Sequence, residues 1–215
     1  MKQIKSLLLF LIGAALSFTT MADSLQNVRT VTAPTELLVS LEVVKAHLEL
    51  ESDFVGDDVQ VESYIQSAQS YCGNYMGVQL VSAAFQGTLE QFPTDRKILF
   101  PKPPLTEVTA ITYFPADGSA AVTIDAADYI VITDTFPGLL LLKDSFILPE
   151  LYDRPDAIKV TFTAGYAAAQ VDAQIKEAVK KVSFELYEHR DNTVKEKRNI
   201  VESFLSHYQG INLGS

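Results

Sequence analysis

The period of the hydrophobic pattern changes twice along this chain, and this change limits the possible folds more than any single motif. Between residues 59 and 76, and again between 175 and 186, apolar residues recur every three or four positions, as on one face of a helix. Between these segments, short apolar runs alternate with polar residues and stop at Pro or Gly, which is typical of strands. The pattern predicts an α+β fold, in which a small helical bundle of N-terminal and C-terminal helices accompanies a central antiparallel β unit.

Residues at the predicted helix ends support this division. Ser40 is placed to cap a short first helix, and Asp172 is placed to cap a later one. Asp57, with Gln60 three residues later, has the form of a capping box at the start of the long helix. Gly77 follows the last apolar residue of that helix, where a left-handed cap is expected to end it.

The middle third of the chain carries seven predicted strands, separated by turn residues. The dipeptide Asp117-Gly118 predicts a hairpin turn between two of them. The three prolines between residues 101 and 104 cannot donate ladder hydrogen bonds, so they predict a loop or a sheet edge. The strands are expected at 85–89, 97–100, 108–114, 122–124, 129–132, 139–142 and 158–162.

These elements predict a single domain over residues 23–210, because no repeat or low-complexity linker divides the sequence. Its expected parts are helices at 40–77, a β unit at 79–164 and helices at 172–208. The segments expected to lie outside these elements are a polar leader at 23–32, a charged connector at 191–198 and a tail at 211–215.

The first 22 residues have the shape of a secretory signal peptide, because Lys2 and Lys5 precede an apolar run at 7–16. That run is shorter than the roughly 20 residues that span a bilayer, so no permanent membrane anchor is predicted. Met21 offers an alternative, in which residues 1–22 are an overcalled gene start. Both alternatives place the start of the working protein near residues 21 to 23.

The charge balance argues against binding to nucleic acid. The chain has 17 Lys and Arg against 27 Asp and Glu, which gives a net charge of −10. A surface of this charge repels a phosphate backbone and releases no counterions by binding it. Sequence-specific binding to DNA or RNA is therefore not expected.

The sequence shows no signature of a catalytic, cofactor-binding or metal site, and no such residue is predicted. His47, His189 and His207 fall on separate predicted elements, without the spacing of metal ligands. The acidic stretch at 49–58 lacks the spacing of a calcium loop and is expected to be a solvated loop. The single cysteine, Cys72, lies on an apolar helix stripe, where a small buried side chain is expected.

The chain ends in a short amphipathic piece and an apolar tail that have no predicted place in the core. Such a segment can fold back on its own domain or dock into a groove of a partner, and the sequence leaves both possibilities open. The candidate partner-binding residues are Phe204, Leu205, Tyr208, Ile211 and Leu213.

The order of the segments resembles that of the head-tail connector (adaptor, or head-completion) proteins of tailed bacteriophages. The closest match is the segment RPDAIKVTFTAGY at 154–166, and the helical phrase VSLEVVKAHL at 39–48 resembles the opening of that family. No single segment is specific to that family, but the ordered set of segments from residue 35 to 208 is specific to it. The other matching segments are 64–76 with the Gln79-Leu80 step, 99–105, 111–119, 175–178, 186–190 and 204–208.

The resemblance implies a structural subunit rather than an enzyme. About twelve copies would form a ring between the portal protein and a neck, stopper or tail-completion protein, extending the DNA channel. The protein would lie in the virion neck after assembly in the host cytoplasm, which favours Met21 as the start. We expect the C-terminal residues named above to contact the portal protein.

Two other functions stay open. If the leader is a genuine signal peptide, the chain is an exported α+β binding or adhesion protein of a bacterial envelope, periplasmic or secreted. A hydrolase would need carboxylates that only the fold brings together, such as Asp134 or Asp153, and no motif supports it.

Overall fold

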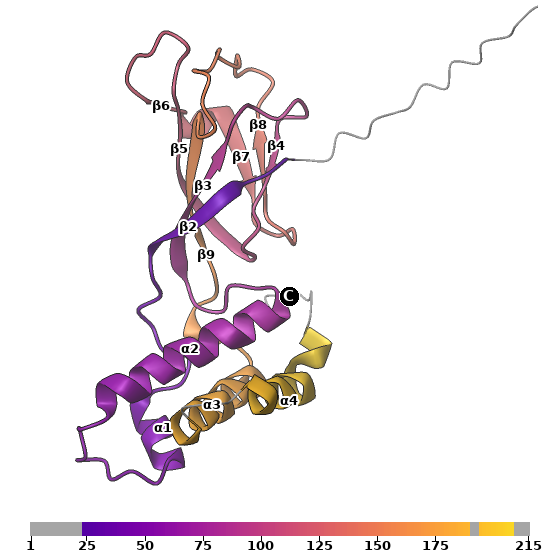
Figure 1. Ribbon diagram of the computed structural model, residues 1–215. Coiled ribbons are helices and arrows are strands. Elements are labelled where there is room, and N and C mark those ends of the chain that lie inside the picture. Colours follow the sequence, from indigo (N-terminus) through magenta and orange to yellow (C-terminus); the bar gives the residue numbers. More distant parts are fainter. Residues whose placement is uncertain (1–22, 190–193, 209–215) are drawn as a thin grey trace, which may run out of the picture.

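The computed structural model describes residues 23–189 and 194–208 of the chain. The expected leader at 1–22 and the tail at 211–215 lie outside these residues. Figure 1 shows an elongated molecule in which strands occupy one half and helices the other. The expected α+β class is confirmed, because helices from both ends of the sequence form one bundle beside a largely antiparallel β unit.

Local signals in the sequence set most of the helix ends. The Ser40 hydroxyl accepts a hydrogen bond from the Val43 amide at 3.4 Å. The Asp172 carboxylate accepts one from the Gln174 amide at 2.8 Å. Gly77 ends the long helix with φ at 75°, as predicted. The helices are α1 (Leu41–His47), α2 (Asp58–Met76), α3 (Ala173–Glu188) and α4 (Val194–Leu205), and a 3₁₀ turn (Ser206–Tyr208) follows α4.

Asp57 is the N-cap residue of α2, as expected, but two other details of the predicted helices were wrong. The capping box of Asp57 and Gln60 does not form, because the Asp57 carboxylate accepts a hydrogen bond from the Tyr187 hydroxyl at 2.8 Å and makes no cap bond. The charged connector expected at 191–198 is helical from Val194 onward. Packing against the rest of the bundle stabilises this helix beyond what its local sequence indicates.

The β unit contains all seven strands expected in the middle third, and two more before α1. The strands are β1 (Asp23–Ser24), β2 (Gln26–Thr32), β3 (Ala83–Leu89), β4 (Lys97–Leu99), β5 (Leu105–Tyr113), β6 (Val122–Thr123), β7 (Tyr129–Ile132), β8 (Leu139–Leu142) and β9 (Ile158–Ala164). One sheet has the order β1-β4-β8-β7 and the other β2-β3-β9-β5-β6. β5 and β6 pair antiparallel on either side of the Asp117-Gly118 turn, which confirms the predicted hairpin.

The polar leader expected at 23–32 is a wrong prediction, because these residues form β1 and β2. β1 pairs in parallel with β4, and β2 pairs antiparallel with β3. β2 lies at a sheet edge with nearly every side chain exposed, so its sequence lacks the apolar alternation of a half-buried strand. Leu25, between the two strands, is the one fully buried side chain of this segment.

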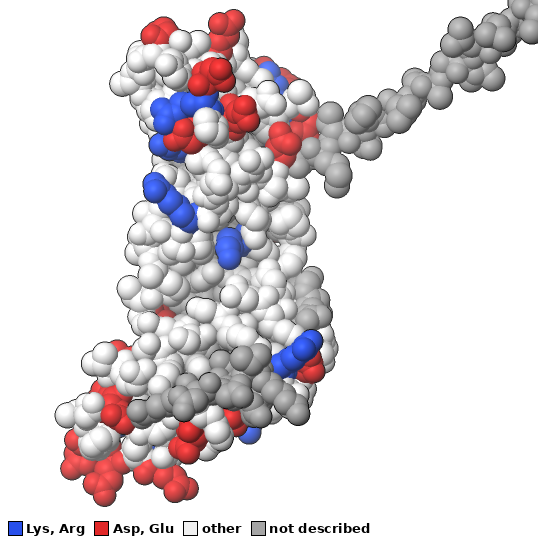
Figure 2. Space-filling model, in the orientation of Figure 1, with Lys and Arg blue, Asp and Glu red and all other residues white. Residues whose placement is uncertain are grey.

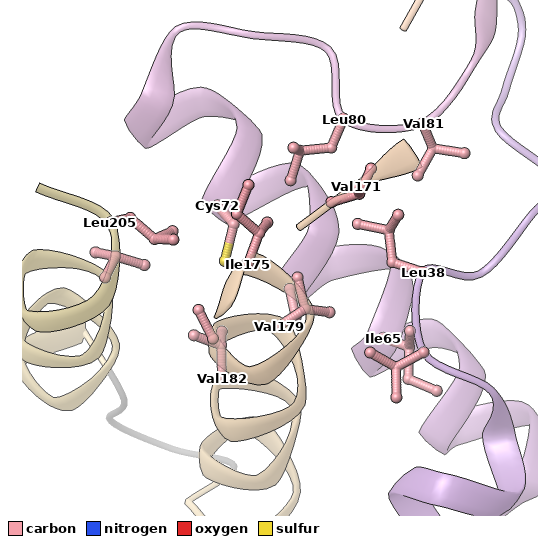
Figure 3. Close-up of a cluster of buried hydrophobic side chains, with 14 of the residues drawn as sticks. Leu38, Ile65, Cys72, Leu80, Val81, Val171, Ile175, Val179, Val182 and Leu205 are labelled. Atoms are coloured by element: carbon pink, nitrogen blue, oxygen red, sulfur yellow. The ribbon is translucent and has the colours of Figure 1, made fainter. Parts of the chain in front are cut away.

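The buried side chains form two clusters, one inside the β unit and one among the helices. In the β cluster, the ring centroid of Phe162 lies 4.8 Å from that of Phe100 and 5.6 Å from that of Phe85. In the helical cluster, side chains from α2, α3 and α4 converge (Figure 3). Cys72 belongs to this second cluster, and burial raises the pKa of its thiol to about 12. Its expected buried position is confirmed.

Three segments of the chain join the β unit to the helical bundle, and they form part of the packed core. Each contributes a side chain to the helical cluster, namely Leu38, Leu80 and Val171 (Figure 3). Apolar contacts therefore hold all three segments against the helices. The three segments are residues 33–40, 77–82 and 165–172.

Backbone hydrogen bonds tie the second and third of these segments together. The Ser82 amide donates to the Tyr166 carbonyl at 3.1 Å. The third segment is also bound to the loop before β5, because the Gly165 amide donates to the Pro104 carbonyl at 2.9 Å. Gly165 has φ at 116°, and a Cβ atom there would lie 2.6 Å from the carbonyl carbon of Val81. Only glycine fits so close an approach of two backbones.

A buried lysine fixes the loop between α1 and α2. The Lys45 side chain is 6% exposed, and its Nζ donates to the Asp58 carboxylate at 2.8 Å. The same ammonium donates to the backbone carbonyls of Ser52 and Phe54, at 3.3 and 2.5 Å. These three acceptors satisfy the three protons of the ammonium group, so the buried charge is fully paired.

We expect Gly165→Ala to lower the free energy of unfolding by roughly 3 kcal/mol or more, because it adds a backbone clash to an unfavourable φ. Gly118→Ala is the matched control, since Gly118 also has a positive φ but a Cβ atom there would make only an ordinary contact with the Tyr152 ring, at 3.9 Å. Its expected cost is about 1 kcal/mol. Urea unfolding of both variants measures the difference, and equal losses would contradict the close approach at Gly165.

We expect Lys45→Met to destabilise the protein by about 3 kcal/mol, because it leaves Asp58 and two loop carbonyls without their partner. Hydrogen exchange should also become faster at the amides of residues 49–58. Arg198→Met is the control: Arg198 pairs with Glu202 at 2.9 Å but is 72% exposed, so its loss should cost less than about 1 kcal/mol. Equal losses in the two variants would argue against the anchoring role of Lys45.

Candidate docking surfaces

The structure brings together the three described residues of the predicted C-terminal binding segment. Leu205 is completely buried in the helical cluster, and Phe204 and Tyr208 pack against that cluster. The Gln174 side-chain amide donates to the Phe204 carbonyl at 3.1 Å, and the Tyr208 hydroxyl donates to the Gln174 amide oxygen at 3.4 Å. The Lys181 ammonium lies 5.7 Å from the centre of the Phe204 ring. This part of the segment therefore folds back on its own chain.

The remaining two residues of that prediction, Ile211 and Leu213, lie outside the described residues. Tyr208 is the last described position, and desolvation together with the nearby Asp172 carboxylate raises the pKa of its hydroxyl. With Leu205 inside the core, Phe204 and Tyr208 are the described residues of this segment that are left to contact a partner. That contact stays a prediction.

A second surface lies at the loop between α1 and α2, at the far end of the helical half (Figure 1). Three apolar side chains are exposed there: Phe54 at 46% and Val55 at 71% in the loop, and Val59 at 83% in the first turn of α2. We call them the loop tip. Apolar side chains grouped on a surface in this way mark interaction sites more often than single exposed ones do.

Acidic residues surround the loop tip. Glu51 and Asp53 are exposed, and Asp57 is held by the Tyr187 hydroxyl. Figure 2 shows acidic groups gathered at this corner of the helical half. The loop is thus an apolar centre with an acidic rim, and Lys45 and Tyr187 fix it from the protein side.

Sequence reasoning missed the loop tip. It treated residues 49–58 as one acidic, solvated stretch. The available signal was the pair Phe54-Val55 inside that stretch. Two adjacent large apolar residues in an acidic, exposed loop indicate an interaction site. The structure shows that neither side chain turns into the core.

A cleft of about 340 Å³ lies between α2 and the β unit, next to the first of the three joining segments. Its lining holds no His, Cys, Asp or Glu side chain. The side-chain oxygen of Gln69, which borders it, accepts a hydrogen bond from the Leu38 amide at 2.7 Å and so has a structural role. Among the described residues of the lining, Lys102 is the one charged side chain.

The three histidines lie apart, as expected from the sequence. The His47 ring packs edge-on against Phe184, with 5.3 Å between the ring centroids. His189 lies 3.1 Å from the Glu185 carboxylate one helical turn away, and the ring of His207 packs against that of its neighbour Tyr208. Each contact is local to the helical half.

The two carboxylates considered for hydrolysis, Asp134 and Asp153, are exposed on separate loops, one after β7 and one before β9. Within residues 23–189 and 194–208, no three His, Cys, Asp or Glu side chains are grouped so that they could hold a metal ion. The described helices include none with the length and apolar character to cross a bilayer. The surfaces above are thus the candidates for function.

Solved structures with the same fold come from gene transfer agent (GTA) particles. The neck of an empty GTA particle computed with C6 symmetry contains a chain with 19% identity and a TM-score of 0.69, covering 86% of this chain and 96% of that one. The virion of a native GTA particle gives 20% identity and a TM-score of 0.63, over 83% and 95% of the two chains. The neck of the native particle computed with C12 symmetry contains a chain with 18% identity and a TM-score of 0.63, covering 86% of this chain and 96% of that one. At these identities the comparison shows a shared fold.

The search of curated proteins finds no match. The family model described as "HCP: Head completion protein" matches residues 37–200, from the segment before α1 into α4. This match covers most of the chain and confirms the family resemblance expected from its segments. The chain belongs to the head completion protein family.

Proposed function

We propose that this protein is a structural head-tail connector subunit of a tailed phage or prophage, forming a ring between the portal protein and the neck. The observation that carries the proposal is the head completion family match over residues 37–200. The shared fold with chains of GTA necks supports it, since those necks were computed with C6 and C12 symmetry. On this proposal the protein works by association rather than turnover.

The charge of the protein suits a ring that lets DNA pass. The net charge is −10, and acidic groups gather at both ends of the face in Figure 2. Carboxylates repel phosphates, so a channel lined by them would not hold a passing duplex through counterion release. We therefore assign no DNA-binding role to the subunit, only the extension of the channel.

The two halves act as one unit in this proposal, which corresponds to the single domain expected over residues 23–210. The packed junction supports this, because Leu38, Leu80 and Val171 tie all three joining segments to the helical cluster. A rigid subunit keeps its contact surfaces in fixed relation, and a closed ring needs each neighbour at the same angle.

The proposed partners are the portal protein on one side and a neck, stopper or tail-completion protein on the other, in the neck of the virion. We assign the portal contact to the C-terminal end, with Leu205 anchoring α4 in the core. Phe204, Tyr208 and the tail residues Ile211 and Leu213 would provide the contacting side chains.

The ring is tested by mixing the purified chain with the portal protein of the same phage or prophage and imaging the product by negative stain. We expect a second ring stacked on the portal, sharing its axis, and native mass spectrometry gives the copy number. Portal alone is the control. A chain that stays monomeric and unbound at micromolar concentrations of both proteins would contradict the proposal.

The C-terminal contact is tested by removing residues 209–215, which deletes Ile211 and Leu213 but leaves Leu205 in place. Burial of each apolar side chain stabilises a contact by about 1.5 kcal/mol or more. We therefore expect the loss of both to lower the affinity for the portal at least about tenfold. A chain that lacks only residues 214–215 is the control, because it keeps both apolar residues. Equal dissociation constants for the two truncations, with unchanged melting temperatures, would show that Ile211 and Leu213 do not contact the portal protein.

A further inference from the structure

The three strands on the β2 side of the five-stranded sheet carry a charge pattern unlike the rest of the chain, and the exposed Glu107 of this sheet lies beyond them on β5. β2, β3 and β9 are neighbours in this sheet and contain no acidic residue, although Asp and Glu number 27 in the chain. Figure 2 shows acidic groups at the two ends of the visible face, with neutral and basic side chains over most of the middle. A surface with this charge pattern is electrostatically complementary to an acidic partner.

The side chains of this face are ordered in a row across the strands. The Arg29 guanidinium donates to the Gln86 side-chain oxygen at 2.7 Å, and the Gln86 amide donates to the Thr161 hydroxyl at 3.3 Å. Arg29 is thus held in place before any partner arrives, which lowers the entropy cost of binding. Val31, on the same strand as Arg29, is 55% exposed and adds apolar area at the edge of the sheet.

Two cations here have no carboxylate within ion-pair distance among residues 23–189 and 194–208. They are Arg29 on β2 and Lys102, which lines the same cleft as Thr30 of β2. At the loop tip the situation is reversed, because Glu51 and Asp53 are exposed with no cation paired to them in the same described residues. Within the described part of the chain, the β2 side of the sheet therefore carries cations without carboxylate partners, and the loop tip carries carboxylates without cationic partners.

These two surfaces cannot meet within one molecule. The loop tip lies at the far end of the helical half, and β2 lies in the β unit (Figure 1). A ring made of identical copies needs two different surfaces on each copy, one to contact each neighbour. The loop tip and the β2 side of the sheet are complementary in charge, and both expose apolar side chains.

We propose that the loop tip of one copy packs against the β2 side of the five-stranded sheet of a second copy, with Glu51 and Asp53 facing Arg29 and Lys102. Phe54, Val55 and Val59 would form the apolar centre of the contact, against Val31 and the threonine-rich sheet face. The proposal rests on the ring proposed above and assigns the surfaces that close it. Because Lys45 and Tyr187 already fix the loop, it binds without first having to order.

Charge reversals test the pairing. Arg29→Glu turns the sheet side acidic, so that it repels the loop tip of its neighbour. Asp53→Lys makes the loop tip less acidic and repels Arg29. Each variant alone should lower ring formation on the portal at least tenfold, scored as rings per portal by negative stain. Lys97→Glu is the matched control for Arg29→Glu, because Lys97 is exposed on β4 in the other sheet and its reversal changes the net charge by the same amount.

An equal mixture of the two variants gives the decisive result. In an alternating ring, the altered sheet side of each Arg29→Glu copy would meet the altered loop of an Asp53→Lys copy. The unaltered loop of the first copy would meet the unaltered sheet side of its other neighbour. Assembly should therefore return to within about threefold of the unaltered chain, which also shows that both variants are folded.

Two outcomes separate this pairing from the ring itself. Single variants that assemble normally, or a mixture as defective as its components, would overturn the pairing and leave the ring standing. A failure of the unaltered chain to form rings would contradict the proposed function.

Discussion

The fold depends on the close approach of two backbones where the β unit meets the helical bundle. At Gly165 a side chain of any size would collide with Val81, and the positive φ of this residue excludes most other amino acids. The approach lets Ser82 pair with Tyr166, which brings Leu80 and Val171 into one apolar cluster. Both cores are therefore aligned by a contact that occupies only a few residues.

Much of the architecture could be predicted because its causes are local. Ser40, Gly77 and Asp172 each act within one helical turn, and the structure uses them as their residue types suggest. The strands of the middle third follow from their own apolar alternation. The family resemblance draws on the same order of local signals, which is why it could be found from the sequence and is matched by the family model.

The remaining features depend on contacts between distant parts of the chain. Asp57 has the form of a cap, but Tyr187, 130 positions away, takes its carboxylate. β2 has no apolar pattern because only its pairing with β3 makes it a strand. The burial of Leu205 and the exposure of Val55 are likewise decided by which neighbours the fold supplies. The charge pattern of the sheet face also appears only after β2, β3 and β9 are placed side by side.

The three joining segments also determine how the molecule can respond to force. A pull along the long axis of Figure 1 that separates the halves would load three lengths of covalent chain in parallel, so stretching is strongly resisted. Bending at the junction is opposed as well, because a tilt of one half against the other would separate Leu38, Leu80 or Val171 from the packed helical cluster. A neck built from such subunits would be stiff against extension, and each copy would keep a constant angle between its two halves.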